Sequence, residues 1–348
     1  MIKKLNIGII GGGFYGCFLS HKLSKNNSIT LYEKTEEIFN KNSAIMNNQH
    51  RLHAGFHYPR SPETIRQINN CHNIFLNEFN ESCFDIKKNI YLIHKNSKIN
   101  FEQYCNIYKN LNIEFEIINT YALDKLKNKD QFAGAIITKE SGINTNKLKM
   151  YFKSILLNSN IKLIYNMEVN NDNIDELKSK HDLLINCTYT NPNIGLKNKF
   201  KVKHEYCSLL LIKNSFSEDE AYTIMDGDFV SIYPSGLGYH TISSVSKTPF
   251  FKYNCSTADI LSKADILSKY NLLNVKSKII NEAKKYFILN ENNIISEYLT
   301  IKIKPEDDEI DDKRDAVVKF EGNYASILCG KISAVYDVLC QIENNYNI

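Results

Sequence analysis

The stretch LNIGIIGGGFYG at residues 5–16 decides the fold of this 348-residue chain. Residues 5–10 are mostly apolar and β-branched, which predicts a buried strand. Gly11, Gly13 and Gly16 then follow in a Gly-x-Gly-x-x-Gly spacing. The first glycine permits a tight turn, the second lets a diphosphate approach the backbone, and the third lets the next helix pack on the strand. The diphosphate would bind at the helix N-terminus, where free N–H groups and the helix dipole favour negative charge.

The residues after the glycines complete a strand–turn–helix–strand unit that ends on an acid. Residues 17–23 show the apolar spacing of a helix, and residues 29–32 form a second apolar run that ends at Glu33. A carboxylate at this place accepts hydrogen bonds from ribose hydroxyls and repels a 2′-phosphate. The unit therefore predicts dinucleotide binding, and the alternative is a glycine-rich turn that holds no ligand.

The composition indicates a globular protein. The chain is 24% charged and 43% hydrophobic, with nine cysteines and a net charge of +4. No apolar run approaches the ~18 residues of a membrane helix, and so small a charge gives no electrostatic case for nucleic acid. The cysteines form no Cys-x-x-Cys pair, which predicts reduced thiols in a cytoplasmic protein. The start of the chain imitates a signal peptide, but three glycines break the apolar run, so we expect a strand there.

Arginine is rare in this chain and clustered. Only four arginines occur, and Arg51, Arg60 and Arg66 fall within sixteen residues. Lysine supplies almost all other positive charge, so the cluster indicates that a planar guanidinium is needed to hold a carboxylate or phosphate. Arg51 and Arg60 are the candidate anion-binding residues, and chance clustering is the alternative.

Residues 43–66 form a polar stretch that contains three histidines, namely His50, His53 and His57. Their closeness raises the question of a metal site. No carboxylate or cysteine lies among them, and Gly55 and Pro59 argue against one continuous helix. We therefore expect a loop packed over a cofactor, and no metal.

The rest of the chain predicts α/β alternation, then a β-rich part, then a closing strand and helix. Ser61 and Pro62 predict the start of a helix that runs to about residue 79. The other predicted elements are strand and helix candidates at 90–94, 101–110, 113–118 and 134–138, helices at 145–157, 258–286 and 332–343, strands at 161–165, 182–187, 208–212, 229–233, 239–243, 295–304 and 324–328, and a solvated acidic loop at 306–312.

At these residues the chain resembles the D-amino-acid-oxidase-like FAD-dependent oxidoreductases. Five segments carry the resemblance: GGGFYG with Glu33, HAGFHY at 53–58, ESGINTNKL at 140–148, DLLINCT at 182–188 and ILCGKIS at 327–333. The second segment is similar to the His-Ala-Gly-x-x-Tyr string of the L-2-hydroxyglutarate dehydrogenase branch. The longer string RLHAGFHYPRSPET also looks like flavoproteins encoded near surface-polysaccharide clusters.

The resemblance implies an α/β fold (α+β overall), in which a Rossmann-like FAD-binding domain is interleaved with an antiparallel-sheet substrate domain. Residues 1–84, 139–204 and 306–348 are expected to form the first domain, and residues 85–138 and 205–305 the second. The implied cofactor-binding residues are Gly11, Gly13, Phe14, Tyr15, Gly16, Glu33, Lys34, Ser43, Asn48, Gln49, Val169, Thr188, Gly330, Lys331 and Ile332.

The resemblance also implies catalytic roles, in a reaction that transfers hydride from a C–H bond beside an amine or hydroxyl to flavin N5. Arg51, Arg60, Tyr233 and Tyr239 are candidates to hold the substrate anion, with packing as the alternative for the tyrosines. His53 is the candidate proton acceptor, and the alternative is that it only orients the flavin. Lys331, expected at the start of the last helix, would stabilise negative charge at flavin N1–C2=O, and a solvated lysine is the alternative.

Two segments depart from the family pattern. The usual Ala-Thr-Gly reads Cys187-Thr188-Tyr189, so its glycine is missing, and the C-terminal segment has only Gly330 where many relatives have two or three glycines. Neither departure touches the glycines at 11–16.

The expected substrate is a small anionic 2-hydroxy acid or amino acid, with a sugar-linked substrate of surface-glycan synthesis as a wider option. One rival is a flavin-dependent isomerase similar to UDP-galactopyranose mutase, with no net redox change. A second rival is a nucleotide-binding regulator without catalysis. No nucleic-acid partner is expected, and the sequence leaves the oligomeric state open.

Overall fold

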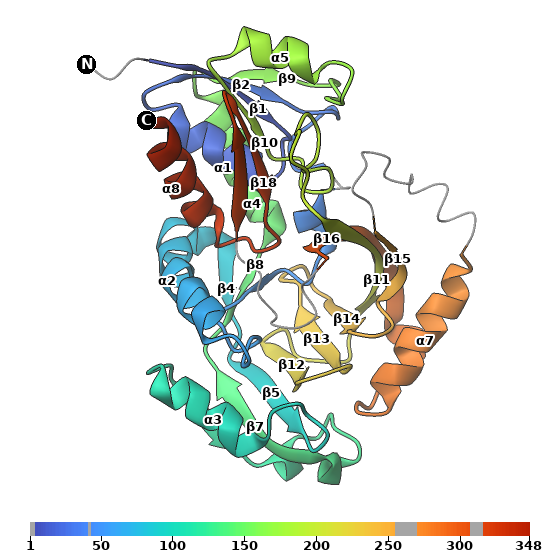
Figure 1. The fold of residues 1–348 in the computed structure, drawn as a ribbon. Helices are drawn as coiled ribbons and strands as arrows, with labels where there is room; N and C mark the ends of the chain where they lie inside the picture. The colour runs from blue at the N-terminus through green and yellow to red at the C-terminus, as the bar shows by residue number, and fades with distance from the viewer. Residues whose placement is uncertain (1–3, 41–42, 255–269, 307–315) are drawn as a thin grey trace.

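A six-stranded sheet that contains β1 forms one half of the computed structural model, which describes residues 4–40, 43–254, 270–306 and 316–348. Its strand order is β17-β18-β10-β1-β2-β9, with all neighbours parallel except β17 and β18 (Figure 1). Its strands are β1 (Asn6–Ile10), β2 (Ser28–Tyr32), β9 (Lys162–Ile164), β10 (Leu183–Asn186), β17 (Val317–Glu321) and β18 (Tyr324–Leu328). The order places β1 beside β10 at the centre, where α/β sheets bind ligands at the carboxyl ends of their strands.

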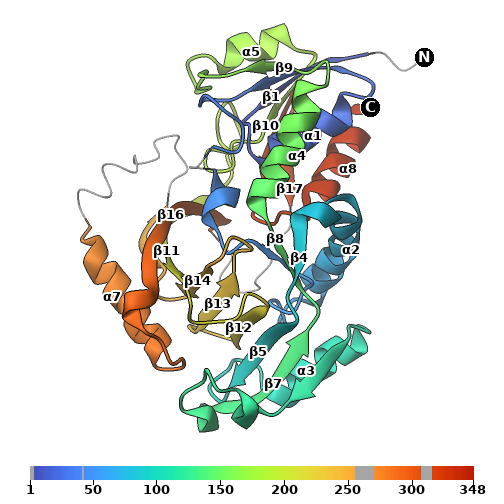
Figure 2. The ribbon, with the colours of Figure 1, turned by 180° about the vertical axis from the view of Figure 1, so that it is seen from behind.

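Helices cover both faces of this sheet because its strands are apolar on both sides. Ile7 and Ile9 of β1 pack with the helices of one face, whereas Ile10 packs with the other. The first face carries α1 (Phe14–Leu23), α4 (Thr145–Leu157) and α8 (Val335–Tyr346), and α2 (Pro62–Glu78) extends away from their end (Figures 1 and 2). The second face carries α5 (Ile174–Lys180).

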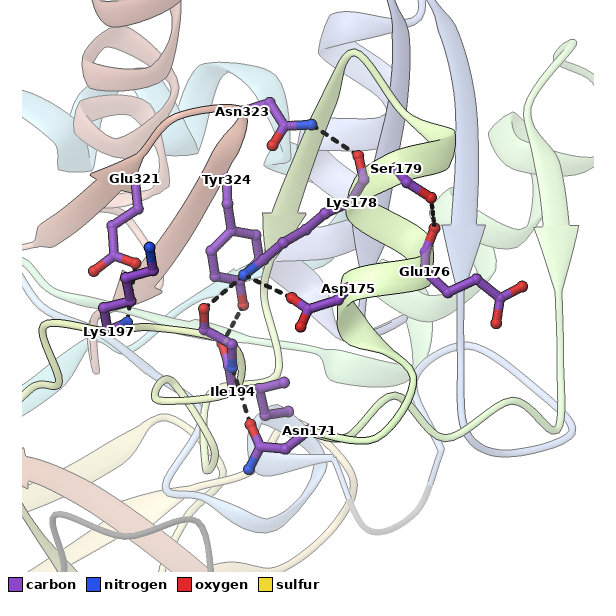
Figure 3. Close-up of polar contacts among 11 residues, drawn as sticks. Asn171, Asp175, Glu176, Lys178, Ser179, Ile194, Lys197, Glu321, Asn323 and Tyr324 are labelled. Carbon is purple, nitrogen blue, oxygen red and sulfur yellow. Dashed lines mark hydrogen bonds and ion pairs between the residues drawn. The ribbon is translucent and has the colours of Figure 1, made fainter.

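Contacts around α5 connect this helix to the segment after β10 and to β18 (Figure 3). Lys178 Nζ donates to the carbonyl of Gly195 at 2.6 Å and lies 4.5 Å from the centre of the Tyr324 ring. The Tyr324 hydroxyl donates to the carbonyl of Ile194 at 2.6 Å, and Asn323 Nδ2 donates to the carbonyl of Lys178 at 2.8 Å. These bonds satisfy backbone groups of the turn after β10 and hold that turn against β18.

A nine-stranded sheet forms the second half, in the order β15-β11-β14-β13-β12-β5-β7-β6, with β16 paired to β11. Its strands are β5 (Lys88–His94), β6 (Phe115–Ile118), β7 (Phe132–Thr138), β11 (Val202–Ile212), β12 (Glu220–Met225), β13 (Val230–Pro234), β14 (His240–Ser244), β15 (Pro249–Asn254) and β16 (Ile294–Pro305). The sheet was predicted to be antiparallel, and it is so except that β5 and β12 run parallel. Helix α7 (Leu272–Lys284) packs on one face, and α3 (Phe101–Asn110) lies near β5 and β7 (Figure 1).

A small third sheet, in the order β3-β8-β4, lies between the two large ones (Figure 2). Its strands are β3 (Arg51–Leu52), β4 (Cys83–Asp85) and β8 (Ser141–Ile143). Strand β3 pairs antiparallel with β8, so the start of the histidine-rich stretch is held against the start of the ESGINTNKL segment.

Most predicted elements are confirmed, and the differences have local causes. The helix predicted to start at Pro62 and the helix at 145–157 occur as expected, and so does the strand at 324–328. Helix α1 begins at Phe14, because Gly13 has the extended backbone of an N-cap residue. The final helix begins at Val335, not at Ile332. The segment before it is held against α1, where the Tyr15 hydroxyl binds the Lys331 carbonyl. Elements not predicted are α5, β3, β4, β8, β12, β15 and β17. The predictions at residues 258–269 and 307–312 lie outside the described residues.

Candidate functional site

The glycine turn after β1 has the shape that a diphosphate requires. Gly11 has φ +100°, and a Cβ there would lie 3.1 Å from the carbonyl oxygen of Cys187. A Cβ on Gly16 would lie 1.8 Å from the Gly11 oxygen, so the first and third glycines are required by the protein itself. A Cβ on Gly13, in contrast, would meet within 4 Å only the hydroxyl of Ser43, at 3.5 Å. Helix α1 starts directly after Gly13 with no side-chain cap, which leaves its N-terminal N–H groups for an anion.

Glu33 lies over this turn. One of its carboxylate oxygens accepts from the Gly12 N–H at 2.6 Å, and the other accepts from the Thr35 N–H at 2.9 Å and the Thr35 hydroxyl at 2.8 Å. The carboxylate is thereby held at the end of β2, next to the glycine turn, as the sequence predicts for an acid that binds ribose. The glycines and Glu33 together fit the ADP half of a dinucleotide cofactor.

Two of the other predicted cofactor residues, Phe14 and Tyr15, lie at the start of α1. The Phe14 side chain lies in an aromatic core with Phe75 and Phe152, so it packs α1 and only its backbone faces the turn. The Tyr15 hydroxyl donates to the Lys331 carbonyl at 2.6 Å and lies 3.0 Å from Cys329 Sγ, which connects α1 to the loop after β18. This contact brings the GGGFYG segment and the C-terminal ILCGKIS segment together.

Three more of these residues follow strands β2, β9 and β10 of the six-stranded sheet. Val169 is buried in the core cluster that contains Ile10, and Lys34 forms an exposed ion pair with Glu168 at 3.7 Å. Thr188 follows β10, and its hydroxyl donates to the Asn191 carbonyl at 2.9 Å. Ser43 faces Gly13, while Ile332 packs on the core beside α8.

Tyr189 occupies the position where the family pattern has a glycine. Its φ is +57°, the left-handed conformation that glycine adopts without strain. The backbone shape is therefore kept although the glycine is absent, at a cost of about 1–2 kcal/mol. Its hydroxyl lies 4.0 Å from where a Gly330 Cβ would be and accepts from the Ile303 N–H at 3.4 Å, so the ring joins the loops after β10 and β18 to β16.

Arg51 is buried on the nine-stranded sheet, not in the glycine turn. Its Nη1 donates to the Thr223 hydroxyl at 2.9 Å and the Tyr91 hydroxyl at 3.2 Å, and its guanidinium lies 4.1 Å from the centre of the Tyr233 ring. Its Nη2 is also buried and has no hydrogen-bond partner among the described residues. Burial opposes the charge, but Tyr91, Tyr233 and Glu140 outweigh it and raise the pKa of Arg51. Arg51 is therefore a buried cation with one donor group, Nη2, that no described residue accepts from.

Glu140 binds Tyr91, one of the two hydroxyl partners of Arg51. The Tyr91 hydroxyl donates to Glu140 Oε2 at 2.6 Å, and the same oxygen accepts from Asn89 Nδ2 at 3.0 Å. Its other oxygen accepts from the Ala54 N–H at 2.7 Å. Burial and the neighbouring carboxylate raise the pKa of Tyr91, so this tyrosine stays protonated.

The HAGFHY segment meets the C-terminal loop at one place. The rings of His53 and His57 are 5.3 Å apart, and each lies within 6 Å of the Tyr58 ring, at 5.7 and 5.5 Å. Lys331 Nζ lies over the Tyr58 ring, 4.6 Å from its centre, and the lysine is only 7% exposed. The structure thus brings His53 and Lys331 to the same tyrosine.

Arg60 lies elsewhere, with its Nε bound to Asp226 Oδ2 at 2.7 Å. Gln49 points to the nine-stranded sheet, where it accepts from Ser231 at 3.1 Å and donates to Thr241 at 3.4 Å. Asn48 accepts from the Gln49 N–H at 2.9 Å. Neither amide side chain is directed at the glycine turn by these bonds.

His50 lies beside Tyr298, which in turn contacts Tyr239. The histidine Nδ1 is 3.4 Å from the Ser235 carbonyl, and burial lowers the pKa of His50 to about 4, so the ring is neutral at physiological pH. Tyr239 and Tyr298 share a hydrogen bond beside it, and burial raises the pKa of Tyr239. Tyr239 therefore contacts Tyr298, whereas Tyr233 contacts the Arg51 guanidinium.

Sequence reasoning missed Tyr91, Thr223 and the supporting role of Glu140. Tyr91 and Thr223 lie 40 and 172 positions from Arg51, and only the pairing of β5 with β12 brings them together. Within the described ranges, no three histidine, cysteine or acidic side chains are placed to hold a metal ion. The same ranges contain no helix with the length and apolarity to cross a membrane.

Comparisons with known proteins agree with this geometry. No family model matches the sequence. The chain is 25% identical over 344 residues to the FAD-dependent monooxygenase FPY4 of Fusarium mangiferae, covering 96% of this chain and 89% of that protein. Its structure is similar to that of L-alpha-glycerophosphate oxidase from Mycoplasma pneumoniae with FAD bound, at a TM-score of 0.73 and 13% identity, with 100% of this chain and 96% of that chain covered.

A second solved structure gives the same result. Glycine oxidase from Geobacillus kaustophilus matches with a TM-score of 0.67 and 12% identity, covering 98% of this chain and 94% of that chain. Both matches extend across the two large sheets and confirm the predicted α/β fold class. The chain has the fold that these two oxidases share.

Proposed function

We propose that the protein is an FAD-dependent oxidoreductase of the D-amino-acid-oxidase-like type. The observation that carries the proposal is the open side of Gly13 beside the uncapped start of α1, with Glu33 fixed at the end of β2. The relative from Fusarium, which aligns with almost the whole chain, is named as FAD-dependent, and this supports the same cofactor.

The residues that would hold FAD come from three segments. The glycine turn and Glu33 would bind its ADP half. Thr188 follows β10, which pairs with β1, and Gly330 follows β18, which pairs with the other side of β10. When bound, FAD would supply the acceptor for a hydride removed from the substrate. The assignments of Lys34, Ser43, Asn48, Gln49, Val169 and Ile332 to this site stay predictions, as do the domain boundaries.

Arg51 would hold the anionic group of the substrate. It is the buried arginine whose Nη2 has no protein acceptor among the described residues, and Tyr233 covers one face of its guanidinium. Arg60 stays a second candidate, but its ion pair with Asp226 already occupies its Nε. An arginine that presents Nη2 from a rigid strand can orient a carboxylate before reaction.

His53 and Lys331 would act at the other end of the substrate. His53 carries an imidazole that can accept a proton from a substrate hydroxyl. Lys331 brings a positive charge to the loop after β18, although this loop precedes α8 and the helix dipole is therefore not adjacent. The charge would favour negative charge that develops nearby during hydride transfer.

The substrate that suits these groups is a small 2-hydroxy acid or amino acid. A specific relation to L-2-hydroxyglutarate dehydrogenases is one option within this chemistry. A sugar-linked substrate is another. A cytoplasmic location and the absence of a nucleic-acid partner stay predictions.

Anaerobic reduction of the bound cofactor tests the proposal. The protein is mixed without oxygen with amino acids, 2-hydroxy acids and sugar nucleotides in turn, and absorbance near 450 nm is followed. We expect at least one small anionic compound to bleach the absorbance fully. Interconversion of a sugar nucleotide without bleaching would support the isomerase instead, and nucleotide binding with no turnover would support the regulator. Bleaching only by a reduced pyridine nucleotide would favour a monooxygenase, as the name of the Fusarium relative suggests.

A further inference from the structure

We propose that Glu140 is a positioning residue that fixes two parts of the site at once: the Arg51 anion anchor, through Tyr91, and the backbone of the 53–58 loop, through Ala54. The inference rests on the proposed function, in which Arg51 binds substrate and the loop carries His53. Glu140 lies between β7 and β8 and is 2% exposed.

The partners of Glu140 allow only an acceptor at this position. The Ala54 N–H, the Asn89 amide and the Tyr91 hydroxyl all donate to its carboxylate, at 2.7, 3.0 and 2.6 Å. A glutamine would turn its own NH2 group toward at least one of these donors, and no rotation of the amide avoids this conflict. The hydrogen-bond pattern therefore calls for a group that accepts at both of its oxygens, as a carboxylate does.

The direction of the Tyr91 hydrogen bond follows from Arg51. A guanidinium only donates, so the Tyr91 hydroxyl accepts from Arg51 Nη1 and must send its own proton elsewhere. Glu140 is the acceptor that takes it. With Nη1 held by Tyr91 and Thr223, the guanidinium cannot turn, and its Nη2 keeps one orientation for a ligand.

The second oxygen of Glu140 fixes the loop. Ala54 directly follows His53, and its N–H is the backbone group that Glu140 binds. Further along, the Gly55 and Phe56 carbonyls accept from the hydroxyls of Tyr108 and Tyr104 at 3.2 and 2.6 Å. One carboxylate thus sets the distance between the anion anchor on β3 and the imidazole two residues later.

The test compares three variants of the FAD-loaded protein in two measurements. Acetate is the probe, since it has the carboxylate but no hydroxyl or amine, and its affinity is measured from absorbance changes of bound FAD. Hydrogen exchange of peptides covering residues 53–58 is measured by mass spectrometry. We expect Glu140→Gln to weaken acetate binding about fivefold and to speed exchange in this loop. Tyr91→Phe should weaken acetate binding similarly and leave the loop exchange unchanged.

Glu205→Gln is the matched control, because Glu205 is equally buried but binds Lys304 at 3.0 Å on β16. We expect it to change neither measurement, even if it lowers the melting temperature. If Glu140→Gln binds acetate within twofold of wild type, or exchanges its loop no faster than Glu205→Gln, the positioning role is wrong. If Glu140→Gln does not fold, unchanged acetate affinity in Tyr91→Phe overturns it. Failure of the wild type to bind acetate at all would overturn Arg51 as the anion anchor and this inference with it, whereas the proposed FAD-dependent activity is tested separately by anaerobic reduction of the cofactor.

Discussion

Gly13→Val is expected to produce a folded protein that no longer retains FAD. Gly13 has φ −77° and ψ −172°, extended backbone that valine adopts readily, and a Cβ there meets only the Ser43 hydroxyl at 3.5 Å. The protein therefore has room for the side chain, whereas a diphosphate on the start of α1 would overlap with it. We expect FAD affinity to fall roughly 100-fold or more, about 2.8 kcal/mol.

The cofactor content of purified Gly13→Val and its far-ultraviolet circular dichroism test this expectation together. Gly16→Val serves as the contrasting variant, since its side chain would overlap with the Gly11 carbonyl. That variant should lose the fold around the turn as well as the cofactor. Stoichiometric FAD in folded Gly13→Val would show that the diphosphate does not lie on this glycine.

Arg51→Lys is expected to weaken substrate binding by about 1–3 kcal/mol, roughly 5- to 150-fold, while FAD stays bound. The arginine uses Nη1 for Tyr91 and Thr223 and keeps Nη2 for a ligand. A lysine has one nitrogen for both tasks. It either leaves two buried hydroxyls without their donor or leaves the ligand anion without its partner.

The dissociation constant of the reducing substrate, from the concentration dependence of anaerobic reduction, measures this loss. Arg66→Lys is the matched control, because Arg66 is exposed on α2. Wild-type affinity in Arg51→Lys would assign the anion to another residue, and Arg60→Lys would then be examined as the second candidate.

The fold could be predicted from the sequence where local rules act alone. The spacing of Gly11, Gly13 and Gly16 reflects the conformation of one turn and the close packing of α1 on it, so it predicted the turn and the helix. Ser61 and Pro62 likewise marked the start of α2. Short strands such as β3 and β4 were not predictable, because two or three residues show no period and are strands only through their pairing with β8.

The candidate site was predictable only in part, for a related reason. The scarcity of arginine indicated Arg51, but its partners come from β5 and β12, which are far apart in the chain and adjacent in the sheet. Lys331 was expected on the last helix, and the Tyr15 hydroxyl instead holds its carbonyl before the helix starts. Tyr189 shows the same limit, since its left-handed backbone is imposed by the loops around it.

The identity of the chromophore released from the purified protein tests the central claim most directly. The protein is denatured, and the supernatant is analysed by chromatography against FAD, FMN and NAD standards. The ADP half that the glycine turn and Glu33 are arranged to bind is present in FAD and absent from FMN. We therefore predict a yellow protein that releases FAD at close to one per chain. Release of FMN or NAD, or no cofactor from a well-folded preparation, would contradict the account.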